Sequence, residues 1–349
     1  MKRESCRIGA AVAVLAMVLL NFTCNVRSPA SRDFMKGVAF AGYSRDAYTR
    51  DVPLRSVDAL KVTNADWASI LATGYQATIR STSIDFSGPG TPSDASLAAL
   101  IGYARSIGLR VMLKPHVDLF DDDLHYRGEI GPGFTAADWS AWFSSYRTFI
   151  LHYAAMAART ECELFCVGCE LGSTAFREAD WRGIIAEIRT VYNGPLIYAD
   201  NLVEGAPDAI HWWDALDYIG EDAYPTLSDK VEPSVSDLLA GWGSFLKKLE
   251  ALSKRWNKPL VLTEIGYRSV RGGTINPWDW QRQGPVDLTV QENAYEAAFR
   301  AISGKSWLAG IFWWQWMPDQ DHGGPTDTGY SPHGKPAESV LRAWFGRAL

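Results

Sequence analysis

Eight short apolar runs, bounded by Gly, Pro or Asn, alternate with amphipathic stretches along this chain. Such alternation is typical of parallel strands joined by crossover helices. We predict strands over Gly37–Tyr43, Tyr75–Arg80, Leu109–His116, Leu164–Glu170, Leu196–Asn201, Tyr218–Tyr224, Leu260–Glu264 and Gly310–Trp316. An open doubly wound sheet would normally carry a Gly-rich phosphate-binding turn after its first strand, and the sequence has none. The pattern therefore favours the α/β class and a single (β/α)8 TIM barrel.

The stretches between these runs carry start signals of helices. Ser93 and Thr135 each precede an amphipathic stretch as candidate N-caps. Thr289 and Glu292 have the spacing of a capping box ahead of a later stretch. Apolar residues recur at helical spacing in all of them, which predicts helix faces that pack on a sheet.

The N-terminal segment has the pattern of an export signal. Basic residues precede the apolar stretch Ile8–Leu20, which is too short to span a membrane. We therefore expect an exported protein, extracellular or attached to the cell envelope. The expected divisions are a signal peptide over 1–24, a short linker over 25–35 and the barrel domain over 36–349.

Cys24 offers a membrane anchor. The segment Leu20–Cys24 resembles the end of a lipoprotein signal, in which Cys24 would be the lipidated first residue of the mature protein. Cleavage near Ser28 without lipidation is the alternative. The membrane would be a partner only through this anchor.

Charge and aromatic content narrow the class of partner. The formal net charge is −6 and the basic residues form no run, so nucleic acid is not an expected partner. The chain has 15 Trp, whose broad apolar faces suit the C–H faces of sugars. No cofactor motif is present, and the first run ends in Ala41–Tyr43 without the His-x-His of metal-dependent hydrolase barrels. We expect a monomer without cofactor or metal.

Cys162, Cys166 and Cys169 are the cysteines of the expected barrel domain. As zinc ligands they lack a fourth partner at a recognised spacing, so we interpret them as small buried side chains. A disulfide through Cys162 would be compatible with export. The alternation of side chains along a strand predicts that Cys166 and Cys169 point in different directions.

Two glutamates stand at the ends of predicted strands. Glu170 closes the fourth run and Glu264 closes the seventh. In a (β/α)8 barrel the active site lies at the C-terminal ends of the strands, so both carboxyl groups are expected at one mouth. A carboxylate that ends an apolar strand is costly to desolvate unless it is paired or used, which makes these residues catalytic candidates.

The sequence resembles a clan of retaining β-glycosidases. Phe165–Leu171 and Leu260–Tyr267 are similar to the clan's segments with the acid/base Glu after strand four and the nucleophile Glu at strand seven. Within the clan, the sequence resembles glycoside hydrolase family 113, known for endo-β-1,4-mannanases. That likeness covers residues 36–346 and is carried by the Trp-rich eighth strand together with Leu113–Asp118, Asp217–Pro225 and Tyr330–Ala337.

The resemblance implies hydrolysis of β-1,4-mannan or glucomannan by double displacement. Glu170 would protonate the leaving oxygen while ionised Glu264 attacks the anomeric carbon. The clan usually has Asn before the acid/base Glu, where its amide contacts the sugar 2-hydroxyl, but this sequence has Cys169. Asn201, which ends the fifth run, is the nearest chemical substitute.

Other strand-end residues are expected to bind substrate or orient the glutamates. Tyr224 is expected to donate a hydrogen bond to Glu264 and keep it ionised. Trp316 is expected to form the floor under the reacting sugar with Trp314 behind it, although alternation predicts that one of the two packs elsewhere.

Polar residues of the second and third runs are also candidates. Lys114 and His116 are expected to reach sugar hydroxyls, with a structural hydrogen bond as the alternative for His116. Arg80 is expected to orient a catalytic carboxylate, with a buried ion pair as the alternative. Trp278 and Trp280, in a long loop, are candidate sugar platforms.

Two other functions remain open at this point. The same chemistry on β-glucan or xylan would give an identical pattern of strands and glutamates. A barrel that binds carbohydrate without cleaving it is the alternative outside the enzyme class, since Cys169 departs from the clan.

Overall fold

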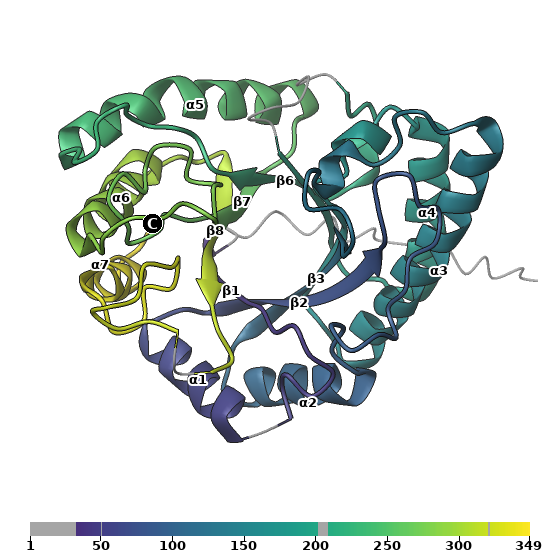
Figure 1. Ribbon diagram of the computed structural model, residues 1–349, viewed down its shortest axis with the longest axis horizontal. Helices are drawn as coiled ribbons and strands as arrows, with labels where there is room; N and C mark the ends of the chain where they lie inside the picture. The colour runs from purple at the N-terminus through teal and green to yellow at the C-terminus, as the bar shows by residue number, and fades with distance from the viewer. Residues whose placement is uncertain (1–32, 50, 202–208, 320–321) are drawn as a thin grey trace, which may run out of the picture. The chain divides into compact units, whose positions relative to one another are not determined.

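Eight parallel strands close into a barrel whose strand order follows the sequence (Figure 1). The computed structural model describes residues 33–49, 51–201, 209–319 and 322–349. The strands are β1 Met35–Phe40, β2 Trp67–Gln76, β3 Arg110–Leu119, β4 Leu164–Cys169, β5 Leu196–Asp200, β6 Tyr218–Ala223, β7 Leu260–Ile265 and β8 Leu308–Trp316. Pairing of β1 with β8 closes the sheet. The expected (β/α)8 barrel is confirmed.

The second predicted strand was misplaced. We predicted Tyr75–Arg80, but β2 is Trp67–Gln76, and residues 77–80 form a turn beyond it. The other predicted runs all overlap their strands.

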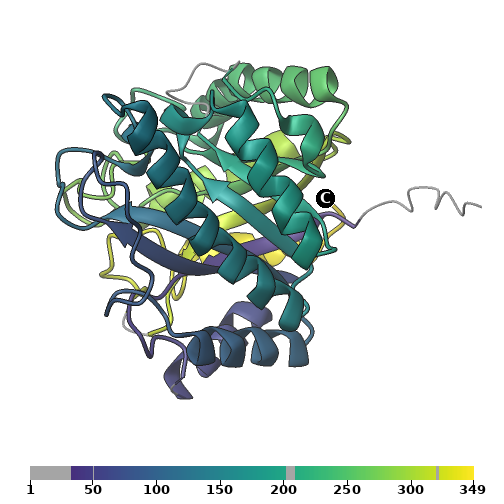
Figure 2. The same ribbon diagram turned by 90° about the vertical axis from the view of Figure 1, so that its right-hand side faces the viewer.

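Helices surround the barrel (Figures 1 and 2). They are α1 Asp51–Val62, α2 Asp94–Ser106, α3 Ala136–Arg159, α4 Glu178–Val191, α5 Val235–Trp256, α6 Leu288–Ile302 and α7 Pro336–Phe345, with 3₁₀ turns η1 Arg127–Glu129, η2 Gly172–Thr174 and η3 Trp213–Ala215. None of the described helices is long and apolar enough to cross a membrane.

Most of the expected helix starts are present. Ser93 caps α2, and Thr135 forms a reciprocal capping box with Asp138 at the start of α3. The capping box expected at Thr289 is wrong, because the side chain of Asp287 caps α6 by accepting from the backbone of Val290.

The barrel interior is apolar near the N-terminal ends of the strands and polar near their C-terminal ends. Met35, Trp67, Leu164 and Phe312 belong to a buried cluster formed mainly from the early parts of the strands. Gly37 makes room for it, since a Cβ there would lie 2.2 Å from the ring of Phe312. Trp67 and Phe312 fill this part of the barrel interior, so polar side chains are found toward the C-terminal ends of the strands.

The three cysteines of the barrel are free and buried. The expectation that Cys166 and Cys169 point in different directions is wrong, since both belong to the interior cluster. A register shift between them, where β4 pairs with β5, breaks the strict alternation of side chains.

The predicted signal peptide over 1–24, with its candidate lipidation site Cys24, lies outside the described residues. So does most of the expected linker over 25–35.

Candidate active site

Two glutamates lie at the C-terminal end of the barrel. Glu170 directly follows β4 and has a positive φ of 53°, an uncommon backbone conformation for a residue other than Gly. Its backbone N–H donates to the carbonyl of Ala199 on β5 at 2.8 Å, which fixes this turn. Glu264 lies within β7. Both side chains are largely buried, with 13% of Glu170 and 7% of Glu264 exposed.

A buried lysine holds Glu264. Lys114 Nζ lies 2.6 Å from Glu264 Oε1 and 3.0 Å from Asp222 Oδ1. Asp222 also accepts from Thr263 Oγ1 at 2.7 Å. Burial alone would lower the pKa of Lys114, but the surrounding negative charges, foremost Asp222, hold it well above its usual value. Lys114 is therefore charged, and it serves as the counterion of two carboxylates.

The second oxygen of Glu264 has its own donor. The expected hydrogen bond from Tyr224 is present, with 2.6 Å between Tyr224 Oη and Glu264 Oε2. Burial and the charge of Asp222 raise the pKa of Glu264, while Lys114 and Tyr224 act in the opposite direction. On balance the pKa of Glu264 lies above its usual value, because burial outweighs the two donors that stabilise the ionised form.

Glu170 has a different environment. Arg127 Nη1 donates to Glu170 Oε2 at 3.0 Å, and Asn201 Nδ2 donates to Oε1 at 3.3 Å. Arg127 also pairs with Asp118 at 3.2 Å, so its charge is shared. Burial raises the pKa of Glu170 to about 8, although Arg127 acts to lower it. The carboxyl group is therefore mostly protonated at neutral pH and able to donate a proton.

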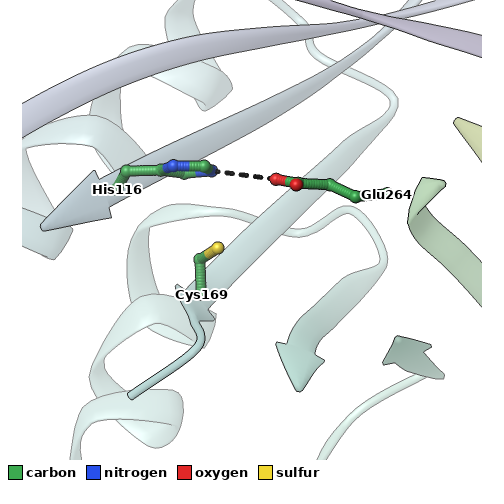
Figure 3. Close-up of side chains that lie close together, drawn as sticks. All are labelled: His116, Cys169 and Glu264. Carbon is green, nitrogen blue, oxygen red and sulfur yellow. Dashed lines mark ion pairs between the residues drawn. The ribbon is translucent and has the colours of Figure 1, made fainter. Parts of the chain in front are cut away.

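Cys169 directly precedes Glu170 in the sequence and ends β4. Its Sγ is 3.3 Å from Asp222 Oδ2, and it lies near both His116 and Glu264 (Figure 3). Asn201, the substitute expected for the missing Asn, contacts Glu170 instead.

The roles expected of two tryptophans are exchanged. Trp316 is buried, and its indole N–H donates to Ser56 Oγ at 3.0 Å, so it packs against α1. Trp314 is half-buried, and its ring is nearly parallel to that of His116, with centroids 6.3 Å apart. Trp314 rather than Trp316 therefore has a face toward the polar side chains at the C-terminal end of the barrel.

Three other expected residues differ in role or position. Lys114 is fully buried and engaged by carboxylates, so it is not free for sugar hydroxyls. His116 is also buried, with Nε2 3.8 Å from Glu264 Oε1. Arg80 is exposed in the turn after β2, because that strand ends at Gln76. Arg127, from η1, takes the place next to a carboxyl group that we expected for Arg80.

Sequence reasoning missed Arg127 and Asp222. Arg127 lies in a long irregular connection where no periodicity marks it. Asp222 lies within Asp217–Pro225, and a carboxylate within an apolar strand is the same signal that identified Glu264. Trp278 and Trp280 are 48% and 69% exposed, which leaves their faces open to a ligand.

The fold and the site define a class of protein. A (β/α)8 barrel with two buried glutamates in different environments at its C-terminal end has the architecture of a glycoside hydrolase.

Comparison with known proteins agrees with this class. The family model of Glycoside Hydrolase Family 113 matches residues 39–335. A complex structure of a β-1,4-mannanase of that family is 30% identical and covers 90% of this chain and 99% of its own, with a TM-score of 0.81. A β-mannanase of the family from Alicyclobacillus acidocaldarius, in complex with ManMIm, is 32% identical, with coverages of 91% and 98% and a TM-score of 0.80. No curated protein sequence matches the chain. The chain belongs to glycoside hydrolase family 113.

Proposed function

We propose that this protein hydrolyses β-1,4-linked mannan or glucomannan with retention of configuration, Glu170 acting as acid/base and Glu264 as nucleophile. The observation that carries the proposal is the contrast between the two glutamates. Burial keeps Glu170 protonated at neutral pH, whereas Lys114 and Tyr224 both donate to Glu264. Double displacement requires one protonated and one ionised carboxyl group, and the two donors to Glu264 stabilise its ionised form.

The reaction has two steps. Glu264 attacks the anomeric carbon and forms a glycosyl ester, while Glu170 gives its proton to the departing glycosidic oxygen. Glu170, now ionised, takes a proton from water, whose oxygen displaces Glu264 from the anomeric carbon. Arg127 stabilises the ionised form of Glu170 between the steps, since its guanidinium lies 3.0 Å away.

The choice of glycan is supported by similar proteins. The β-1,4-mannanase and β-mannanase structures match nearly the whole barrel at about one third identity or slightly below. Trp314 is the proposed platform for the reacting sugar, and Asn201 is placed to reach hydroxyls beside Glu170. Trp278 and Trp280 are proposed outer platforms.

The proposed function is tested with purified protein and three substrates, mannohexaose, xylohexaose and cellohexaose. We expect mannooligosaccharides as products, released with the β configuration in NMR spectra taken before mutarotation. Cleavage of only another glycan would overturn the substrate assignment but keep the mechanism. An inverted product would overturn the mechanism, and no cleavage would favour a binding protein.

We also propose that the protein is exported and anchored through Cys24. The apolar stretch Ile8–Leu20 and the lipoprotein-like Leu20–Cys24 support this location. Mass spectrometry of the mature N-terminus tests it, because a diacylated Cys24 is expected and an unmodified N-terminus near Ser28 would contradict the anchor.

A further inference from the structure

Three potential metal-ligand atoms face one another near the C-terminal end of the barrel interior. Cys169 Sγ, one ring nitrogen of His116 and one carboxylate oxygen of Glu264 lie within 4.8 Å of one another, and His116 Nε2 is 3.8 Å from Glu264 Oε1 (Figure 3). The three side chains come from β4, β3 and β7 and are all buried. Rigid strands therefore hold a thiol, an imidazole and a carboxylate around one point.

His116 provides an independent sign of a ligand. Its buried Nε2 has no hydrogen-bond partner among the described residues, and a buried polar atom without a partner is costly. A neutral imidazole has a nitrogen lone pair, which is the form that binds metals.

The charge balance also favours a cation. Lys114 is shared between Asp222 and Glu264, and Arg127, whose Nη1 lies 4.0 Å from Cys169 Sγ, is paired with Asp118, so these five charged groups carry one net negative charge. Deprotonation of Cys169 would add a second, and a divalent cation would neutralise both. Lys114 would keep its two contacts with Asp222, at 3.0 and 3.1 Å, if a cation took Oε1 of Glu264.

We propose that Cys169, His116 and Glu264 form an inhibitory binding site for one thiophilic divalent cation of the Zn²⁺ type. Zn²⁺ binds such donors at about 2.0 to 2.3 Å in a tetrahedron, so the three side chains would have to move closer together on binding. Solvent would supply the fourth ligand. On binding, the Cys169 thiol releases one proton to solvent, and neutral His116 releases none.

Occupation of this site would stop catalysis. The inhibitory consequence rests on the proposed function, because the cation would bind the carboxylate of Glu264 that attacks the sugar. The susceptibility is specific to a chain with Cys at this position, since the Asn usual in the clan has no thiolate to offer. Zn²⁺ would thus be a reversible inhibitor, and a chelator would restore activity.

Binding is tested without substrate, so that its outcome is independent of the proposed function. Untagged protein is dialysed against Zn²⁺ and, in parallel, titrated with Co²⁺ while the near-ultraviolet thiolate-to-cobalt absorption is recorded. We expect one equivalent of bound metal and a thiolate band in the wild type. Cys169→Ser should abolish the band and weaken binding at least about 10-fold. His116→Gln should weaken binding while keeping the thiolate band.

Cys162→Ser is the matched control. Cys162 is also free and buried but precedes β4, at the opposite end of that strand from Cys169. This variant should bind metal as the wild type does. Circular dichroism establishes that each variant is folded, and Cys169→Asn replaces Cys169→Ser if the latter is not.

Inhibition is measured separately on mannohexaose. Zn²⁺ should inhibit the wild type reversibly, and Cys169→Asn should need at least about 10-fold more Zn²⁺ for the same loss of rate. Absence of bound metal in the folded wild type would overturn the proposal, as would an unchanged affinity in Cys169→Ser. A protein that binds one equivalent through Cys169 but cleaves no glycan would keep the metal site and refute the proposed function.

Discussion

Arg127 should set the alkaline limit of activity through its contact with Glu170. Glu170 must be protonated to act as the acid, so kcat/KM should fall as the pH rises through its pKa of about 8. Arg127 Nη1 lies 3.0 Å from Glu170 Oε2, and its positive charge favours the ionised form. Removing this charge in Arg127→Met should raise the pKa of Glu170 and move the alkaline limb to higher pH.

The size of this effect follows from the geometry. Two unit charges about 4 Å apart interact by about 4 kcal/mol at an effective dielectric constant of about 20. Asp118, at 3.2 Å from Arg127, shares the guanidinium and reduces what Glu170 feels. A nearby opposite charge typically changes a carboxyl pKa by about 1 to 3, so we expect the limb to move by about 1 to 2 pH units.

The assay is the pH profile of kcat/KM on mannohexaose, whose poor leaving group makes proton donation necessary. Arg127→Lys keeps a charge at this position and should move the limb less than Arg127→Met. Arg80→Gln is the matched control, because this exposed arginine lies in the turn after β2 and should leave the profile unchanged. An alkaline limb that stays in place in Arg127→Met would refute the reasoning.

Three further predictions follow from the same contacts. Tyr224→Phe removes the 2.6 Å hydrogen bond to Glu264, so kcat/KM should fall by about 10- to 100-fold and the acidic limb should move to higher pH, whereas an unchanged acidic limb would contradict this role. Trp314→Ala should raise KM with little loss of melting temperature, while Trp316→Ala should cost about 3 to 5 kcal/mol in the free energy of unfolding, and thermal denaturation with steady-state kinetics distinguishes them. Glu170→Ala should reduce activity on poor leaving groups far more than on activated aryl glycosides, and equal losses on both would remove Glu170 from the role of acid.

Much of the fold could be predicted because a (β/α)8 barrel repeats one local pattern. Apolar runs ending in polar residues identified most strands. Thr135 predicted the start of α3, because its side chain caps that helix. The second strand was misplaced, because the apolar run Trp67–Ala72 forms most of β2 and the predicted Tyr75–Arg80 overlaps only its end. Because Arg80 was predicted at the end of that strand, it was also expected at the active site, where it does not lie.

Residues of the candidate site could be predicted only where the topology of the barrel places them, at the ends of strands. Glu170 and Glu264 stand at strand ends, so topology alone brings them to one end of the barrel. The partner of Glu170 could not be found in this way, because Arg127 reaches it from an irregular connection whose path depends on tertiary packing. The exchange of Trp314 and Trp316 and the inward turn of Cys169 depend on local irregularities of β8 and β4 that strict alternation does not describe.

The most direct test of the account is the identity of the residue that becomes attached to sugar. Purified protein is incubated with an activated 2-deoxy-2-fluoro-mannoside, which slows the second step, and the labelled peptide is sequenced by mass spectrometry. The account predicts one equivalent of glycosyl ester on Glu264, and none in Glu264→Gln. A label on another carboxylate, or no covalent adduct in a protein that cleaves mannan, would contradict the assignment of Glu264 as the nucleophile.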